Sequence, residues 1–304
     1  MTAAAARDGT PYKHVLCPVD FSDVSRAALE WSLRFAKEVG ARLTILHVVD
    51  IRGLSVGNLV AVPGSLDEMR QEAEEMLITW RHDIDFGGAR VEVADGVPSD
   101  GIVSAAHRND VDLVVMGTYG LGGLQKLLLG SVTEKVLHHL KVPLLTLSPK
   151  LMDRKTSASS KPKTVVMALD PGEDSTAIIR HAVWLAEHYQ AKLVAAHAVP
   201  IPAVLLDDRT LQMVPVEELA SLEASLVEER RKELSAMLPR IETEVEIVVT
   251  VGAPFEVLRA LARERSADLM VMGAGGHGAS GLLWLGSTSH KMVRSAECPV
   301  LIAR

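Results

Sequence analysis

Two glycine-rich segments with the same spacing are the part of this sequence best suited to chemistry. Residues 117–131 read GTYGLGGLQKLLLGS and residues 273–287 read GAGGHGASGLLWLGS. Each consists of Gly-x-x-Gly, nine further residues and Gly-Ser, and each lies between an apolar strand-like run and a helical pattern. Because N–H groups in such a loop and at a helix N-terminus attract anions, the repeat predicts two phosphate sites. The residues at the fixed positions are Gly117, Gly120, Gly130 and Ser131, then Gly273, Gly276, Gly286 and Ser287.

An aspartate ends the first predicted strand of each half, at Asp20 and Asp170. A doubly wound sheet binds ligands at the carboxyl ends of its strands, where the strand order reverses. If the first and fourth strands flank that reversal, the aspartate and the glycine loop face one crevice, and the carboxylate can bind the hydroxyl pair of a ribose. The alternative is structural, because an aspartate at this place can simply begin a turn or cap a helix.

The serine of each Gly-Ser pair opens the last predicted helix of its half. There, the hydroxyl and the backbone N–H of Ser131 or Ser287 can donate to a phosphate. The alternative for Ser131 is helix capping, because Ser-Val-Thr-Glu, ending at Glu134, matches a capping box. The second copy has His290 at the matching position, so capping explains its serine less well.

Other polar side chains carry weaker signals. Lys126 in the first loop is either a phosphate counter-charge or a surface lysine, whereas the second loop has His277 and neither Lys nor Arg. His47 and His197 occupy matching strand positions, and we expect them to be partly buried, with satisfied hydrogen bonds, rather than catalytic. The sequence has no P-loop, nucleophile elbow or metal-binding motif, and therefore no recognisable machinery for rapid catalysis.

Apolar runs alternate with helical periodicity, which predicts parallel sheets covered by helices on both faces. Ser22 or Asp23 is expected to cap the first helix and Gly40 to end it, whereas Pro98 and Pro254 suit the first turns of later helices. The expected strands are 13–19, 42–49, 89–94, 112–116, 143–147, 163–169, 192–199, 244–250, 268–272 and 299–303. The expected helices are 23–39, 65–83, 98–109, 131–140, 174–190, 216–238, 254–265 and 287–295.

The two halves align along their whole length. Asp20 and Asp170 are 150 residues apart, and Gly117 and Gly273 are 156 residues apart. A chain of 304 residues is long enough for two domains, each with its own core. We therefore predict domains at 11–149 and 163–304, joined by a polar linker at 150–162.

Composition limits the class of protein. A net charge of −7 and a pI of about 5.9 argue against non-specific binding to nucleic acid. The N-terminal residues lack the pattern of a signal peptide, and no apolar run is long enough to cross a bilayer, so we expect a cytoplasmic protein with no membrane partner. Cys17 and Cys298 lie in or beside strand patterns of different halves and are expected to be buried, reduced thiols.

These motifs resemble those of the universal stress protein family in its tandem two-domain form. The resemblance implies two doubly wound, open, parallel five-stranded sheets of order 3-2-1-4-5, Rossmann-like and in tandem. It also implies that ATP or a related adenine nucleotide, with or without Mg²⁺, occupies the crevice. Family members pair through their last strands, so VPLLTLS and CPVLIAR are expected to form an internal pseudo-dimer. Further homodimerisation and the identity of a regulatory protein partner are left open.

Carried over to this chain, the resemblance assigns the parts of two nucleotide sites. Asp20 is placed at the ribose and Val48 at the adenine, and the glycine-rich segment is placed at the phosphates. The second copy departs at Ala168, Ala198 and Thr288, and we therefore expect the first site to bind more tightly. The first site consists of Pro18, Asp20, Val48, Gly117, Gly120, Gly130, Ser131 and Val132. The second consists of Asp170, Ala198, Gly273, Gly276, Gly286, Ser287 and Thr288.

The function that follows is a regulatory nucleotide sensor of the stress response. One alternative is a slow ATPase or an enzyme that phosphorylates itself at Ser131 or Ser287, although no general base is identifiable from spacing. The other is a protein-interaction module without nucleotide, in which the glycine loops serve packing. The intact Gly-Ser pairs and both aspartates count against it.

Overall fold

The computed structural model describes residues 9–54, 65–119, 129–151, 161–200, 215–239, 241, 243–275 and 285–304. The predicted loop residues Gly120, Lys126, Gly276 and His277 lie outside these ranges, as does most of the predicted linker.

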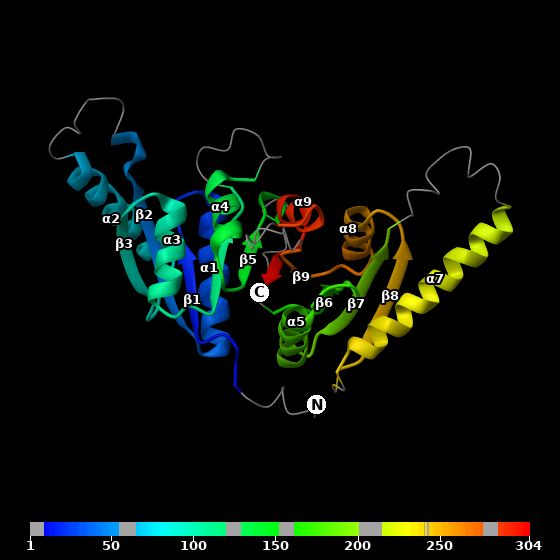
Figure 1. Ribbon diagram of the computed structural model, residues 1–304. Coiled ribbons are helices and arrows are strands. Elements are labelled where there is room, and N and C mark those ends of the chain that lie inside the picture. The colour runs from blue at the N-terminus through cyan, green and yellow to red at the C-terminus, as the bar shows by residue number, and fades with distance from the viewer. Residues whose placement is uncertain are drawn as a thin grey trace.

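The described strands form two parallel five-stranded units with the same order (Figure 1). Strand order is β3-β2-β1-β4-β5 in the first unit and β8-β7-β6-β9-β10 in the second, which confirms the expected order 3-2-1-4-5. In both units the first and fourth strands are neighbours, as the site prediction required. The first unit has β1 (His14–Pro18), β2 (Arg42–Asp50), β3 (Arg90–Gly96), β4 (Leu113–Gly117) and β5 (Leu144–Leu147). The second has β6 (Thr164–Ala168), β7 (Lys192–Val199), β8 (Val245–Val251), β9 (Leu269–Gly273) and β10 (Val300–Ala303).

The last strands of the two units pair antiparallel, which confirms the expected contact between the halves. Val300 faces Thr146, Leu301 faces Leu145 and Ile302 faces Leu144. The pairing joins the two predicted sheets into one mixed ten-stranded sheet and covers an edge of each.

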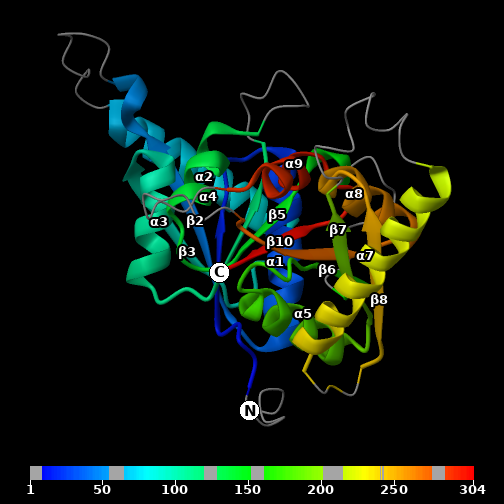
Figure 2. The same ribbon diagram turned by 45° about the vertical axis from the view of Figure 1, so that its right-hand side comes forward.

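Helices cover both faces of this sheet (Figures 1 and 2). Because successive side chains of a strand point to opposite faces, each strand feeds two separate apolar cores. One core lies under α1 (Asp23–Val39), α2 (Ser65–Asp83), α5 (Thr176–Tyr189) and α7 (Val216–Met237). The other lies under α3 (Pro98–Arg108), α4 (Ser131–His139), α8 (Pro254–Glu264) and α9 (Ser287–Ser295). Two short 3₁₀ helices, η1 (Ile51–Leu54) and η2 (Pro149–Leu151), complete the described elements.

Local signals set the helix boundaries much as the sequence predicts. Ser22 caps α1 by accepting a hydrogen bond from the Ser25 N–H at 3.2 Å, and Gly40 ends the helix in the left-handed region at φ 71°. Pro98 and Pro254 lie in the first turns of α3 and α8. Each predicted element agrees with its observed bounds to within two residues.

The two units are also locked together by side chains. On one face, the buried Tyr12 places its hydroxyl 2.7 Å from Nδ1 of His181 and its ring against Trp184 of α5. On the other face, Ser148 donates to the carbonyl of Ala296, and Arg304 donates to the carbonyl of Leu137. Ser148 and Arg304 are 156 residues apart, so equivalent residues of the two repeats each bind the last helix of the other unit.

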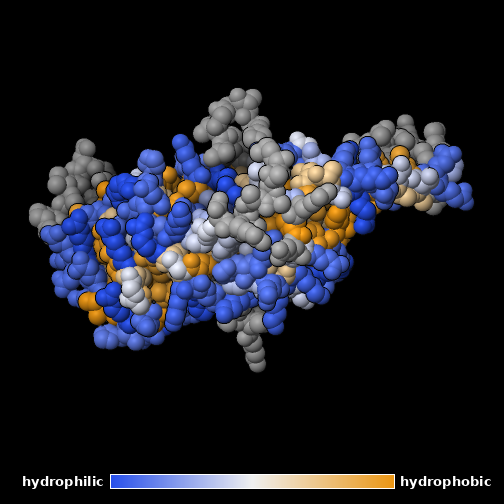
Figure 3. All heavy atoms as spheres, turned by 90° about the horizontal axis from the view of Figure 1, so that it is seen from below, coloured by the Kyte–Doolittle hydropathy of each residue, from blue (hydrophilic) through white to orange (hydrophobic). Residues whose placement is uncertain are grey.

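The structure places both cysteines in the core and shows the character of the surface. Both cysteines are free and buried, as predicted. Among the described residues, no helix has the length and apolar character needed to cross a bilayer. Seen from below, hydrophilic residues cover much of the surface, with apolar ones showing between them (Figure 3).

Candidate functional site

A cavity of about 860 Å³ opens at the carboxyl ends of β1, β2 and β4, and a smaller one of about 240 Å³ lies at the matching place in the second unit. All predicted site residues that fall in the described ranges line these two cavities. The first is lined by Pro18, Asp20, Val48, Gly117, Gly130, Ser131 and Val132. The second is lined by Asp170, Ala198, Gly273, Gly286, Ser287 and Thr288. The fold thus brings each aspartate and its glycine segment to one cavity, and ligand binding by these residues stays a prediction.

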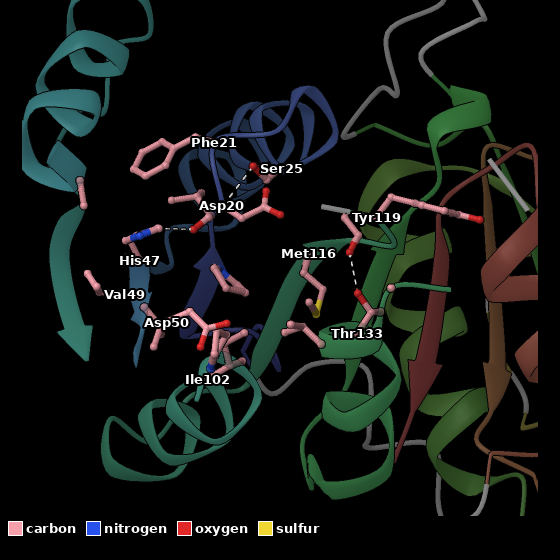
Figure 4. Close-up of a pocket in the computed structure, with 18 of the residues that line it drawn as sticks. Asp20, Phe21, Ser25, His47, Val49, Asp50, Ile102, Met116, Tyr119 and Thr133 are labelled. Atoms are coloured by element: carbon pink, nitrogen blue, oxygen red, sulfur yellow. Dashed lines mark hydrogen bonds between the residues drawn. The ribbon is translucent and has the colours of Figure 1, made fainter. Parts of the chain in front are cut away.

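Each aspartate accepts hydrogen bonds in a local turn through one carboxylate oxygen, which leaves the other oxygen available to a ligand. Asp20 Oδ1 accepts from the backbone N–H and the hydroxyl of Ser22, at 3.1 and 2.6 Å. Asp170 Oδ1 accepts from the N–H of Gly172 at 3.0 Å. Oδ2 of both residues has no hydrogen-bond partner among the described residues. The turn role and the ribose role are therefore compatible, and Figure 4 shows Asp20 at the cavity between His47 and Met116.

Two glycines of the repeated pattern in the first unit allow close contact between neighbouring segments of the chain. A Cβ on Gly117 would lie 2.8 Å from Cγ1 of Val24 in α1. Gly130 donates its N–H to the carbonyl of Thr118 at 2.9 Å, and a Cβ there would lie 3.1 Å from the same oxygen. Such contacts leave no room for a larger residue without movement of the backbone.

The second unit repeats this arrangement with slightly more space. A Cβ on Gly273 would lie 3.3 Å from Cδ1 of Ile178, the flexible end of a side chain. Gly286 donates its N–H to the carbonyl of Ala274 at 2.7 Å, and a Cβ there would lie 3.3 Å from Cα of Gly275.

The helix that follows each loop begins without a side-chain cap. Gly130 and Gly286 are the N-cap residues of α4 and α9. The alternative role of Ser131 as the N-cap of a capping box is therefore wrong: Gly130 is the N-cap, and Ser131 is an exposed residue of the first turn. Glu134 donates its N–H to the Gly130 carbonyl, whereas the three preceding N–H groups have no partner among the described residues. These N–H groups lie at the cavity, and α9 repeats the arrangement. Unpaired N–H groups at a helix N-terminus favour anions, so phosphate binding here stays a prediction.

A hydroxyl in the first turn of each helix fixes this end of the helix to the sheet. Thr133 donates to the carbonyl of Gly117 at 3.0 Å, and Ser289 donates to the carbonyl of Gly273 at 2.8 Å. The two residues are equivalent in the repeats, and both are buried. Sequence reasoning missed them, although a hydroxyl residue two positions after each Gly-Ser serine was the available signal.

The two histidines behave as predicted. Nδ1 of His47 donates to the carbonyl of Val19 at 2.9 Å, and Nδ1 of His197 donates to the carbonyl of Leu169 at 2.8 Å. Burial lowers the pKa of His47, so its ring is neutral near pH 7. Both rings are thus held in place at a cavity wall by a hydrogen bond from Nδ1 to the end of the neighbouring strand.

Charged side chains around the cavities are mostly acidic. Asp20, Asp50 and Glu72 line the first cavity, and Asp170 and Glu173 line the second. The described lining of both cavities contains neither lysine nor arginine. The described residues also contain no group of three or more His, Cys, Asp or Glu side chains placed to hold a metal ion.

Comparison with known proteins matches residues 11–148 and 161–304 separately to the universal stress protein family. Universal stress protein MJ0531 of Methanocaldococcus jannaschii is 34% identical over 139 residues, which cover 44% of this chain and 81% of that protein. A universal stress protein from Archaeoglobus fulgidus DSM 4304 superposes with a TM-score of 0.68 at 25% identity, over 97% of this chain and 98% of that one. A third relative, solved as a universal stress protein in complex with cAMP, is 24% identical over 45% of this chain and 98% of its own, with a TM-score of 0.32.

Proposed function

Because this chain belongs to the universal stress protein family through both of its halves, we propose that it binds ATP or a related adenine nucleotide in the first cavity. The second cavity binds the same ligand more weakly. Occupancy of the cavities regulates the protein's interactions in a cytoplasmic stress response. The observation that carries the proposal is the convergence of a ribose-type carboxylate, a glycine segment and an uncapped helix N-terminus on one cavity.

The phosphates of the proposed ligand lie at the start of α4. The N–H groups of Ser131 and Val132 and the Ser131 hydroxyl have no partner among the described residues and can donate to phosphate oxygens. Because the described lining has no cation, the polyphosphate arrives with Mg²⁺, which offsets part of its charge.

The nucleoside of the proposed ligand lies at the ends of β1 and β2. Oδ2 of Asp20 accepts from the ribose hydroxyls, and Val48 packs against the base. Val48 is held from behind by α3, since a Cβ on Gly101 would lie only 3.0 Å from its Cγ2. The apolar wall beside Val48 includes Pro18 and Ile102.

An enzyme is the second candidate, and one observation favours it. Ser131 is exposed at the cavity with a hydroxyl that no described residue binds, as a self-phosphorylated serine requires. Catalysis also needs a base within reach of that hydroxyl. His47 lines the cavity, but no hydrogen bond joins its ring to the Ser131 hydroxyl among the described residues. A nucleotide sensor therefore ranks above an ATPase, and an interaction module without nucleotide ranks below both.

Nucleotide carried through purification tests the proposal. Protein purified without added nucleotide is denatured and its small molecules are identified by mass spectrometry, and stripped protein is then titrated with Mg-ATP, AMP and cAMP. We expect Asp20→Ala and Gly130→Val each to weaken the tight binding event by a factor of about 10 or more. Their second-unit counterparts, Asp170→Ala and Gly286→Val, are the matched controls and should leave it intact. Absence of binding by the folded wild type at millimolar nucleotide would favour the interaction module.

A further inference from the structure

The first cavity reaches both faces of the sheet. Along β2, Val48 belongs to the core under α3 and α4, whereas Ile45 belongs to the core under α1 and α2. Because side chains alternate, His47 and Val49 lie on the α1 and α2 side as well. Both of them line the cavity together with Val48. The cavity therefore continues past the strand ends to a second compartment, which we call the annex, lined by Phe21, His47, Val49, Met69, Ala73 and Met76.

Among the described residues, only the first unit has an annex. Met69, Ala73 and Met76 all come from α2, whose first half borders the cavity. No described residue of α7, the matching helix, lines the second cavity. At the position of Phe21 the second unit has Pro171. The annex is thus additional to the repeated nucleotide-type site.

One wall of the annex is a fixed aromatic ring. Phe21 has φ 65°, a conformation that is uncommon and strained for a residue with a bulky side chain. Its ring centroid lies 4.6 Å from that of His47 and 5.4 Å from that of Trp80, which it meets edge-on. In Figure 4 Phe21 and His47 lie on the α2 side of the cavity, whereas Ile102 lies on α3. Strain of this kind persists where the surroundings hold a residue in place, and it is concentrated at ligand sites.

The other wall is made of methionine. Met76 is 41% exposed, among the few large apolar side chains of the described chain that are this exposed. Thioethers adapt to varied shapes and contact aromatic rings favourably. Glu72 of α2 also borders the cavity, and the described residues that line the annex include neither lysine nor arginine. A negatively charged group is therefore disfavoured there.

We propose that the annex binds a small planar aromatic compound without negative charge, at the same time as the nucleotide occupies the crevice on the other face. The rings of Phe21 and His47 stack on or meet the edge of the compound, and the two methionines close over it. This binding does not require that the nucleotide proposal be correct, because the annex residues are separate from Asp20 and from the glycine segment.

A neutral aromatic fluorophore, N-phenyl-1-naphthylamine, tests the annex with the full chain. We expect saturable binding to one site, and unchanged affinity when Mg-ATP is present at saturation. Met69→Gln and Met76→Gln should each weaken binding of the fluorophore about tenfold, which is the effect of losing about 1.4 kcal/mol of apolar contact. Ile78→Gln is the matched control, because Ile78 is a still more exposed apolar residue of α2 that does not line the cavity.

Three results would overturn the annex: no saturable binding by the folded wild type, equal weakening by Ile78→Gln, or displacement of the fluorophore by ATP in proportion to ATP occupancy. The last would place the fluorophore in the nucleotide crevice. Circular dichroism of each variant shows whether it has folded, and Phe21→Leu gives a second route to the same wall if a methionine variant does not fold. Fluorophore binding with no binding of ATP would contradict the proposed function and leave the annex standing.

Discussion

The backbones of the two units follow the same fold, but the side chains that line their cavities differ. Both have the same strand order, an aspartate after the first strand and an uncapped helix after the fourth. Yet the first cavity encloses about 860 Å³ and the second about 240 Å³. The two units repeat the features placed at the phosphates and ribose of the proposed ligand. They differ in several side chains at or beside the cavities, at Pro18 and Ala168, Val48 and Ala198, Phe21 and Pro171, and Val132 and Thr288.

The outer helices account for much of the difference. Leu234 of α7 is fully buried in the core against the sheet. Leu77 and Trp80 anchor the second half of α2 in the same way, while its first half borders the annex. The way each helix meets its strands therefore decides whether the cavity extends to this face.

The largest expected effect is on the free energy of unfolding, and it compares His181 of α5 with the matching residue of α1. Burial lowers the pKa of His181 to about 4, and the matching residue of α1 is Trp31. Because the pKa of an unfolded histidine is near 6.5, folding leaves His181 with fewer protons between pH 6.5 and 4, and stability falls as pH falls through that window. We expect a loss of roughly 3 kcal/mol from this residue. Urea denaturation at pH 7.5 and pH 4.5 measures it, and an equal loss in His181→Phe would contradict this origin.

The second comparison concerns the glycines that end β4 and β9. Gly117→Ala forces a Cβ into Cγ1 of Val24, whereas Gly273→Ala meets only the flexible end of Ile178. We expect the free energy of unfolding to fall by about 2 kcal/mol in the first variant and by less than about 1 kcal/mol in the second. Denaturant midpoints of the two variants, measured side by side, decide whether the first unit is packed more tightly here.

The two aspartates give the third comparison. Asp20→Ala removes a charged acceptor from the proposed ribose, and a hydrogen bond to a charged group contributes about 1.5–3 kcal/mol. We expect the tight affinity for Mg-ATP to fall by a factor of about 10 to 100. Asp170→Ala should change only the weaker binding step. Calorimetric titration distinguishes the two, and similar losses of tight binding in both variants would mean that the sites are not ranked as proposed.

The smallest expected effect is a gain in the affinity of the second cavity for Mg-ATP. Ala198→Val restores in the second cavity the side chain that the first has at Val48. Added apolar contact of about 0.8 kcal/mol per methylene predicts an affinity rise of about threefold to tenfold at the weaker site. Equilibrium binding of Mg-ATP to this variant in the Asp20→Ala background isolates that site. No gain there would show that the base is not held by this wall.

The sequence predicts the fold well because repeats, periodicity and turn residues are local signals. The range 23–39 for α1 needs only Ser22, Gly40 and a regular apolar face. The capping box at Ser131 was wrong because the pattern Ser-x-x-Glu also occurs where Gly130 is the N-cap and Ser131 is the first residue of the helix. The Tyr12–His181 contact and the annex could not be predicted, because they depend on how distant elements pack. The predicted site residues that the structure describes line one cavity in each unit, as their spacing implied, but spacing does not predict the shape of that cavity.

Calorimetric titration of the stripped, full-length protein with Mg-ATP tests the central claim most directly. Two unequal nucleotide sites predict one tight binding event at a molar ratio of one, followed by a weaker second event that reaches a ratio of two. Asp20→Ala then weakens the first event by a factor of about 10 to 100 and leaves the second unchanged. Two sites of equal affinity, or no heat of binding at millimolar Mg-ATP from a folded protein, would contradict the account.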